Sequence, residues 1–345
     1  MESDFSISLI YNLPVFAEGA GIPTENVDLS QSQIQEGIDT IFSTLKQISN
    51  ASVFGTDGNV EKLFSFLDLE KPDLVFNLCE SVGHDASKEM CVASMYELMS
   101  INYTGSNALT LGTLLNKSRV KEILSYHKIP TPKFFVAKLN SKKISHNLQF
   151  PLIVKPLKED ASIAIENESV VKNQTELFNR IKYIHTNFNQ DALVEEFIDG
   201  REINVAILGN GENINVLPLS EIEMTSLPEN FPKIVTYNAK WMKGTIEFEN
   251  TIRVCPVNIE QKLIEKIHTI ALESYEILSL RDYARVDMRI DKFGNPFVLE
   301  INPNPDLSTD AGFVAAANVF GLTYEKLIES IVNCAIEREK VFCVN

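Results

Sequence analysis

The segment from residue 284 to residue 302 most constrains the fold, because it predicts an antiparallel hairpin with two unlike faces. Its arms read ARVDMRI and PFVLEIN, with KFGN between them. If Asp291 pairs with Pro296, the two residue numbers of every further pair across the hairpin sum to 587, as for Met288 and Leu299. One face is then apolar and consists of Val286, Met288, Ile290, Phe297, Leu299 and Ile301. A slip of one residue would bury the polar set, so the alternation specifies the register.

The opposite face of this hairpin pairs Asp287 with Glu300, and Arg285 with Asn302. Directly opposed Cβ atoms lie about 4.5–5.5 Å apart, where like charges repel. Two carboxylates and an amide without an intervening lysine suit a hard cation, and Mg²⁺ usually combines such carboxylates with substrate phosphates. The face therefore indicates a site for Mg²⁺ and a nucleotide. The alternative is a solvent-facing strand whose acids pair with Arg285 and Arg289.

Length and charge limit the classes of protein to consider. The 345 residues suffice for two or three domains, each with a core. A formal net charge of −16 argues against binding to nucleic-acid backbones. An anionic nucleotide would still bind if lysines and arginines gather in one cleft. No apolar run approaches the roughly 20 residues of a membrane helix.

The five cysteines are scattered and odd in number, without a Cys-x-x-Cys pair. This distribution favours free thiols in a reducing compartment over a disulfide framework or a zinc site. The first residues, MESD, lack the positive start of a signal peptide. We therefore expect a cytoplasmic protein with neither nucleic acid nor a membrane as its partner.

Strand-like and helix-like segments alternate along the chain, which predicts an α/β architecture in three units. These units cover residues 1–106, 107–190 and 191–345, and the first resembles a small doubly wound domain. The predicted strands cover 5–12, 71–78, 134–137, 151–156, 192–198, 202–208 and the two hairpin arms. The predicted helices cover about 31–47, 86–99, 116–124, 176–186, 259–277 and 324–338. The longest predicted loop, 226–245, has the length that is often functional.

Two lysines are candidates for binding phosphates. Lys155 closes the apolar run of residues 152–154, and a lysine at the end of a buried strand needs a partner, which a triphosphate would supply. Lys117, near a helix start, is a weaker candidate for the same role. The segment from Glu195 to Glu202 joins two strands through an Asp-Gly turn. Its acids are either simply solvated or placed where a purine edge and ribose hydroxyls would bind.

Taken in order, these segments resemble the ATP-grasp superfamily and, within it, the D-alanine–D-alanine ligases. The resemblance covers nearly the whole chain and is strongest from residue 101 to 330. The motifs that carry it are Lys117, Lys155-Pro156, Glu195 to Ile198, Arg201-Glu202, Arg285 to Asp287, Glu300 to Asn302, Tyr103 to Ser106, Ile129 to Pro132 and Tyr237 to Trp241. Each motif alone is weak, but the ordered set is specific. The implied fold is an N-terminal doubly wound domain followed by two α+β subdomains that enclose the ATP site.

The resemblance also implies the roles of single residues. ATP phosphates would contact Lys117, Lys155 and Lys240, the last from the long loop closing as a lid. Adenine and ribose would lie at Glu195, Glu196, Phe197, Ile198 and Glu202. One or two Mg²⁺, with Mn²⁺ as the substitute, would bind Asp287, Glu300 and Asn302. The reacting centre would involve Arg285, Lys240 and Ser162.

The implied chemistry is that of an ATP-dependent carbon–nitrogen ligase. The γ-phosphate first activates a substrate carboxylate as an acyl phosphate, and an amine then displaces inorganic phosphate. The protein mainly positions these groups and stabilises charge, and a closed lid keeps water out. A homodimer is expected because relatives are dimers.

The loops depart from the ligase pattern. Asp160 and Ala164 stand where the phosphate loop of the ligases carries glycines, and only Ser162 keeps the expected residue type. This loop is therefore either structured differently or impaired. After Asn302 the chain adds Asp306 and Asp310, which would either meet a cationic acceptor or cap the following helix.

The N-terminal substrate segment also matches poorly, and Glu18 is the candidate there for holding a substrate ammonium group. We therefore predict a ligase that joins amino acids or small peptides. One alternative is a divergent D-alanine–D-alanine ligase. The other is a non-ligating ATP-binding module that serves regulation or assembly.

Overall fold

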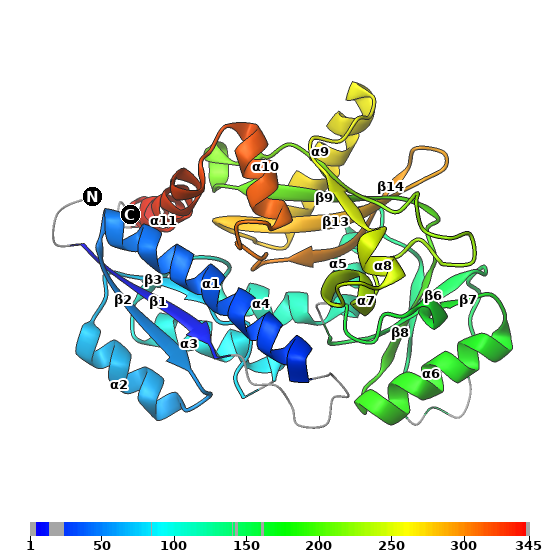
Figure 1. Ribbon diagram of the computed structural model, residues 1–345, viewed down its shortest axis with the longest axis horizontal. Coiled ribbons are helices and arrows are strands. Elements are labelled where there is room, and N and C mark those ends of the chain that lie inside the picture. Colours follow the sequence, from blue (N-terminus) through cyan, green and yellow to red (C-terminus); the bar gives the residue numbers. More distant parts are fainter. Residues whose placement is uncertain are drawn as a thin grey trace.

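The computed structural model describes residues 5–13, 24–83, 85–139, 141, 144–159 and 162–342, with the backbone alone for 24–34 and 339–342. These residues form three sheets with helices packed against them (Figure 1). The predicted α/β architecture is confirmed. Among the described helices, none has the length and apolar character needed to cross a membrane.

The first sheet has the order β2-β1-β3-β4, and all of its neighbouring strands are parallel. Its strands are β1 (Ser6–Asn12), β2 (Asn50–Thr56), β3 (Leu74–Leu78) and β4 (Asn102–Tyr103). Side chains of α1 (Thr24–Ile48) enter the core on one face, while α2 (Val60–Glu70), α3 (Glu89–Leu98) and α4 (Ala108–Leu115) pack on the other. This is the predicted doubly wound arrangement. Four elements of this unit were not predicted from the sequence: β2, β4, α2 and α4.

The second sheet has the antiparallel order β5-β8-β6-β7. It consists of β5 (Phe134–Ala137), β6 (Leu152–Pro156), β7 (Val170–Val171) and β8 (Ala192–Glu196). Helix α6 (Gln174–Phe188) covers it through Leu177, Ile181 and Ile184. Because β8 lies between β5 and β6, we propose that the second unit ends after residue 196 and not at the predicted residue 190.

The third sheet has the order β12-β11-β9-β13-β14, with β10 pairing beside β9. Its strands are β9 (Gly200–Leu208), β10 (Asn215–Val216), β11 (Ser220–Glu223), β12 (Ile252–Val254), β13 (Tyr283–Asp291) and β14 (Pro296–Asn302). Helices α5 (Lys117–Tyr126) and α9 (Gln261–Ile277) share its core. The last helices, α10 (Gly312–Phe320) and α11 (Tyr324–Phe342), instead join the core of the first sheet, and α11 lies beside α1 in Figure 1.

The predicted hairpin register is observed only at the open end of the hairpin, away from the turn. Asp287 faces Glu300 and Arg285 faces Asn302, as predicted, but a bulge follows, and Met288 faces Val298. The prediction that Met288 faces Leu299 is therefore wrong. Val298 enters the core in place of Leu299, which instead lines a cleft. The bulge is stabilised because the carbonyl groups of Leu299 and Val298 accept hydrogen bonds from the side chains of Lys121 and Thr131, at 3.1 and 2.8 Å.

A buried carboxylate connects the first unit to the third. Asp282 is 0% exposed, and both of its oxygens lie 2.6 Å from the guanidinium of Arg338 on α11. It also accepts hydrogen bonds from the Gly105 backbone and the Asn210 side chain, at 2.8 and 2.9 Å. The first and third units are thus held together by a buried ion pair and its hydrogen bonds.

Candidate active site

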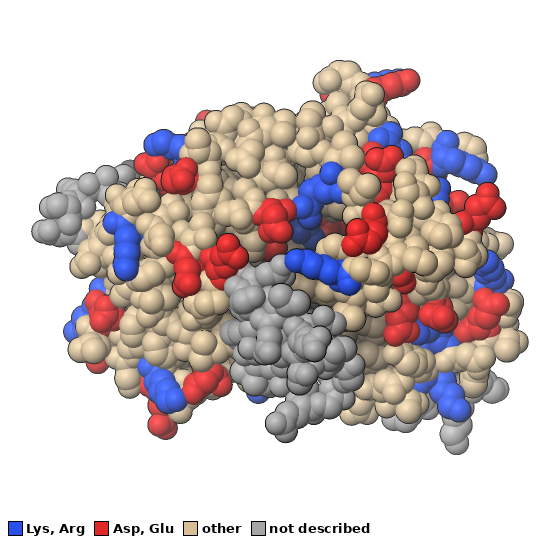
Figure 2. Space-filling view, in the orientation of Figure 1, with Lys and Arg blue, Asp and Glu red and all other residues tan. Residues whose placement is uncertain are grey.

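A cleft between the second and third sheets gathers most of the predicted site residues. Its lining includes Lys117, Lys155, Ser162, Glu195, Glu196, Phe197, Ile198, Glu202, Asp287 and Glu300. Arg285 and Asn302 adjoin this lining on β13 and β14, whereas Lys240, Asp306 and Asp310 stand outside it. In the space-filling view, basic side chains lie in a recess near the middle of the face and acidic side chains stand around it (Figure 2).

The acidic pair expected to bind metal lies on the cleft face of β13 and β14. Arg285 donates to both oxygens of Asp287, at 2.7 Å each, and Asn204 donates to Oδ1 at 2.7 Å. Asp287 is 5% exposed, so it is not the solvent-facing acid of the alternative interpretation. A metal would therefore share the Asp287 carboxylate with the Arg285 guanidinium.

Glu300 is the more available ligand of this pair. Burial by itself would raise its pKa, but the charges of Lys117, Lys155, Arg285 and Lys240 outweigh that effect and lower it. Glu300 is therefore an ionised carboxylate facing a set of cations.

The donor set fits Mg²⁺, since two carboxylates and the Asn302 amide oxygen are hard ligands. Asn302 Oδ1 accepts the Asn304 backbone N–H at 2.8 Å and retains a second lone pair. Among the described residues, no group of three or more His, Cys, Asp and Glu side chains could hold a metal. A bound Mg²⁺ would thus take further ligands from the nucleotide, as that ion commonly does.

A buried ion-pair network includes Lys155, one of the two lysines expected to bind phosphates. Glu195 is 0% exposed and pairs with Lys155 at 2.7 Å and with Lys121, which is 1% exposed. The two lysines outweigh the effect of burial and lower the pKa of Glu195 to about 2. Burial alone would lower the pKa of Lys155, but the Glu195 charge raises it.

Lys121 was not among the site residues predicted from the sequence. Its Nζ also donates to Thr131 Oγ1 at 2.9 Å and to the Leu299 carbonyl, so it connects α5 to the bulge of the β13–β14 hairpin. The available signal was its position four residues after Lys117, on the same helix face.

The segment after β8 has the open backbone edge expected of a purine site. The N–H groups of Glu196 and Phe197 donate to the Lys133 and Pro151 carbonyl groups, at 2.9 and 3.0 Å. No hydrogen bond within the described part of the chain uses the Ile198 N–H. The adenine edge is therefore expected at Ile198, whereas the Glu195 side chain holds the two lysines and not the base. Burial raises the pKa of Glu202, the ribose candidate.

The altered phosphate loop adopts a conformation that favours glycine. Ser162 and Ala164 have φ values of +60° and +57°, although neither is glycine. Arg180 holds this backbone, donating to the Ala164 carbonyl at 2.7 Å, to Glu166 at 2.7 Å and to Ser169 Oγ at 2.9 Å. Side-chain hydrogen bonds from Arg180 thus hold the left-handed backbone at Ala164.

Ala164→Gly should stabilise the protein by about 0.5–1 kcal/mol, because an L-residue is strained in the left-handed region and glycine is not. The measurement is the free energy of unfolding in urea. Ala315→Gly in α10 is the matched control and should destabilise by about 1 kcal/mol, since it lies within a helix. Equal destabilisation by both variants would contradict the strain at Ala164.

The long loop contains a short helix that reaches the phosphate loop. Helix α7 (Tyr237–Trp241) is followed by α8 (Ile246–Glu249). The Tyr237 N–H donates to the Ile165 carbonyl at 2.9 Å, and Glu247 accepts from both Asn238 and Asn167, at 3.2 and 3.4 Å. Lys240 is exposed, with its Nζ 5.3 Å from the Trp241 ring centroid. The segment therefore lies against the end of the predicted phosphate loop, where a lid is expected.

The acids after Asn302 do not cap α10. Asp306 accepts from the backbone and hydroxyl of Ser308, at 2.8 and 2.7 Å, and so closes a local turn. Ala311 is the N-cap of α10 and has no side-chain cap hydrogen bond, so the capping alternative for Asp310 is wrong. Glu18 lies outside the described residues.

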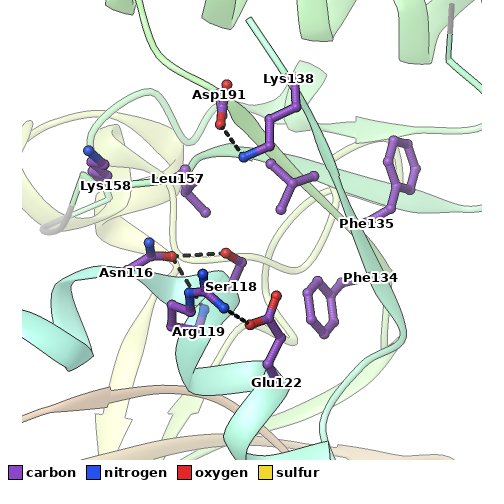
Figure 3. Close-up of a pocket in the computed structure, with 11 residues that line it drawn as sticks. Asn116, Ser118, Arg119, Glu122, Phe134, Phe135, Lys138, Leu157, Lys158 and Asp191 are labelled. Carbon is purple, nitrogen blue, oxygen red and sulfur yellow. Dashed lines mark hydrogen bonds and ion pairs between the residues drawn. The ribbon is translucent and has the colours of Figure 1, made fainter.

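A second cavity lies outside the cleft, between α5, β5 and the segment after β6 (Figure 3). Four of its five charged residues pair locally: Arg119 with Glu122 at 2.7 Å, and Lys138 with Asp191 at 2.9 Å. Its lining contains none of the predicted site residues. The cleft between the sheets is therefore the candidate active site.

Comparisons with known proteins agree with this geometry. The family model described as D-ala D-ala ligase C-terminus matches residues 123–333. An uncharacterized protein, y4sG of Sinorhizobium fredii, is 38% identical over 265 residues, covering 77% of this chain and 75% of that protein. The D-alanine–D-alanine ligase of Carboxydothermus hydrogenoformans is 31% identical over 310 residues, covering 87% of this chain and 92% of the ligase.

A solved structure resembles the whole chain. The D-alanine–D-alanine ligase from Bacillus anthracis, complexed with ATP, superposes with a TM-score of 0.72 at 21% identity. The match covers 98% of this chain and 99% of that one. At this identity the likeness shows the fold, and the ATP-grasp prediction is confirmed.

Proposed function

Because the chain belongs to the D-alanine–D-alanine ligase family of the ATP-grasp superfamily, we propose that it ligates an amino acid or small peptide to the amine of another. The family consists of ATP- and Mg²⁺-dependent carboxylate–amine ligases, and this chain is one of them. What we propose is the identity of the substrates and the roles of the individual residues. It is carried by one observation, the convergence of Lys117, Lys155, Glu202 and the Asp287–Glu300 pair on one cleft.

The chain's own residues have distinct tasks in the proposed reaction. Lys117 and Lys155 bind the phosphates, and the buried Glu195 orients Lys155. Glu202 accepts hydrogen bonds from the ribose hydroxyls, while the backbone at Ile198 hydrogen-bonds to the base. Asp287, Glu300 and Asn302 hold Mg²⁺, which when bound neutralises charge on the transferring phosphoryl group.

The remaining site residues act on the substrate carboxylate and the phosphate. Arg285 stabilises charge at the reacting carboxylate, and its pair with Asp287 sets its direction. Ser162 of the phosphate loop and Lys240 of the lid approach the phosphates when the lid closes. Exclusion of water by this closure protects the acyl phosphate from hydrolysis.

The substrates are proposed to differ from two D-alanines, because the loop after Asn302 has changed its chemistry. Asp306 and Asp310 are exposed acids, and Ala311 offers no side-chain hydroxyl at the start of α10. The field of Asp306 reaches Arg285, so a positively charged or amine-rich acceptor would be favoured there. We keep Glu18 as a further candidate for a substrate ammonium group.

ATP-dependent phosphate release should appear with one or more pools of L- and D-amino acids and short peptides, in the presence of Mg²⁺. Mass spectrometry of an active pool should show a product equal to the two substrates minus water. The control reaction omits Mg²⁺ and should release no phosphate. ATP binding without release from any pool would contradict the proposed substrates.

A second candidate is supported by the relatives, several of which are D-alanine–D-alanine ligases. Phosphate release with D-alanine as the only substrate, and a product with the mass of two D-alanines minus water, would favour this second candidate. A homodimer is part of either proposal and is tested by light scattering of the purified protein.

A further inference from the structure

Arg289 is a buried cation in the wall of the cleft with no role in the reaction described so far. It lies on β13, two residues beyond Asp287, and pairs across the sheet with Glu202 of β9. Alternation along the strand turns Arg289 to the cleft side, whereas Met288 and Ile290 enter the core. The side chain is only 3% exposed. Arginine is seldom buried this fully without a specific set of partners.

The partners of Arg289 belong to the elements that surround the predicted purine site. Its Nη2 donates to the Gly200 carbonyl at 2.9 Å and to the Lys233 carbonyl at 2.5 Å. Its Cζ lies 5.0 Å from the ring centroid of Phe197. These contacts hold the guanidinium between the turn after β8 and the segment that leads into the lid. The group is therefore fixed in place before any ligand enters.

One N–H donor of this fixed guanidinium makes no hydrogen bond to the described residues. The buried Arg289 Nε–H has no hydrogen-bond acceptor among the described residues. The nearest carboxylate, Glu202 Oε2, is 4.0 Å from Nε, beyond hydrogen-bonding distance. An unsatisfied buried donor is costly, so such groups in functional clefts usually meet a ligand or water. Glu202 is also the residue proposed to hold the ribose.

The surroundings of Arg289 match the base end of a nucleotide and not the phosphate end. Apolar side chains line this part of the cleft: Ile153, Phe197, Ile198, Ile234, Val235 and Leu299. The phosphate lysines, Lys117 and Lys155, are instead grouped with Glu300. A purine ring held by its Watson–Crick edge at Ile198 keeps two further ring acceptors, N3 and N7, for another donor.

We infer that Arg289 is a nucleotide-specificity residue whose Nε–H donates to a ring nitrogen of the bound purine. This inference rests on the proposed function, because it assumes that the cleft binds ATP. The ligand class is a purine nucleotide with an acceptor away from the Watson–Crick edge. A pyrimidine triphosphate lacks both ring acceptors and should bind more weakly.

The experiment measures binding of ATP, 3-deaza-ATP and 7-deaza-ATP to the intact protein by calorimetry, without substrate. The wild-type protein should bind one of the deaza analogues about tenfold to a hundredfold more weakly than ATP, because a hydrogen bond to a charged group is lost. Arg289→Met should bind ATP more weakly than the wild type by a similar factor. This variant should bind that analogue and ATP with equal affinity. Arg289→Lys tests the same loss of Nε while keeping a positive charge.

The matched control is Arg201→Met, since Arg201 pairs with Glu221 on the other face of β9 from Glu202. This control should keep the wild-type discrimination. Melting temperatures with and without ATP separate misfolded variants from weak binders. If the wild type distinguishes neither analogue, or Arg289→Met keeps its preference for ATP, the inference is overturned. If the wild type binds no ATP, the proposed function itself fails.

Discussion

Replacing Glu300 with glutamine is expected to lower ATP-dependent turnover by at least about a hundredfold and to leave the fold intact. Removal of one preorganised charge at a transferring group typically costs that much. Glu300 faces the cleft from β14 and is ionised among Lys117, Lys155, Arg285 and Lys240. The neutral amide keeps its shape but weakens its hold on Mg²⁺. Because Glu300 is outside the apolar core, the secondary structure should be unchanged.

The measurement is phosphate release at a series of Mg²⁺ concentrations, with the circular dichroism spectrum as the test of folding. Asp287→Asn should lose a similar amount of activity and also some stability, since Asp287 carries the ion pair to Arg285. Glu329→Gln on α11, a half-buried acid paired with the exposed Lys326 away from the cleft, is the matched control and should keep full activity. Full activity of Glu300→Gln at low Mg²⁺ would remove Glu300 from the metal site.

Glu195→Gln is expected to destabilise the protein by about 3–5 kcal/mol at pH 7, the usual effect of removing one partner from a buried ion pair. Lys121 would be left fully buried, with Thr131 and the Leu299 carbonyl as its remaining partners. Lys155 would lose the carboxylate that fixes its ammonium group, so the affinity for ATP should fall as well. The measurement is the free energy of unfolding in guanidinium chloride.

The same carboxylate predicts a pH dependence of stability. Its pKa falls from the ordinary value of 4.5 to about 2 in the folded protein. A lowered folded-state pKa contributes stability above the unfolded value, and that contribution is lost as the pH falls from about 4.5 through about 2. The shift corresponds to about 3 kcal/mol. Glu195→Gln should lack this component, so its stability should change less than that of the wild type in this pH range.

A double variant provides the control for this prediction. Lys121→Met with Glu195→Gln removes the stranded charge together with its partner, and it should recover part of the stability lost by Glu195→Gln alone. Glu122→Gln, next to Lys121 but exposed and paired with Arg119, should change stability by less than about 1 kcal/mol. A loss of under 1 kcal/mol for Glu195→Gln would contradict a tight ion pair at this position.

Local patterns in the sequence were sufficient for the longer strands and most of the longer helices, and for the Asp287–Glu300 pair. These features depend on periodicity, which is encoded in neighbouring residues. The outer half of the hairpin was predicted wrongly because both Val298 and Leu299 are apolar, so the pattern does not distinguish which enters the core. The choice depends on Lys121 and Thr131, which are far away in the chain and hydrogen-bond to the bulge.

The sequence by itself therefore determined the fold class, the family and most of the residues that converge on the cleft. Only the tertiary structure decided that Glu195 holds two lysines, that Arg180 holds the phosphate loop, and that Arg289 enters the cleft. Each of these side chains obtains its role from partners distant in sequence. A buried charge is stable only where the fold supplies such partners, and periodicity carries no information about them.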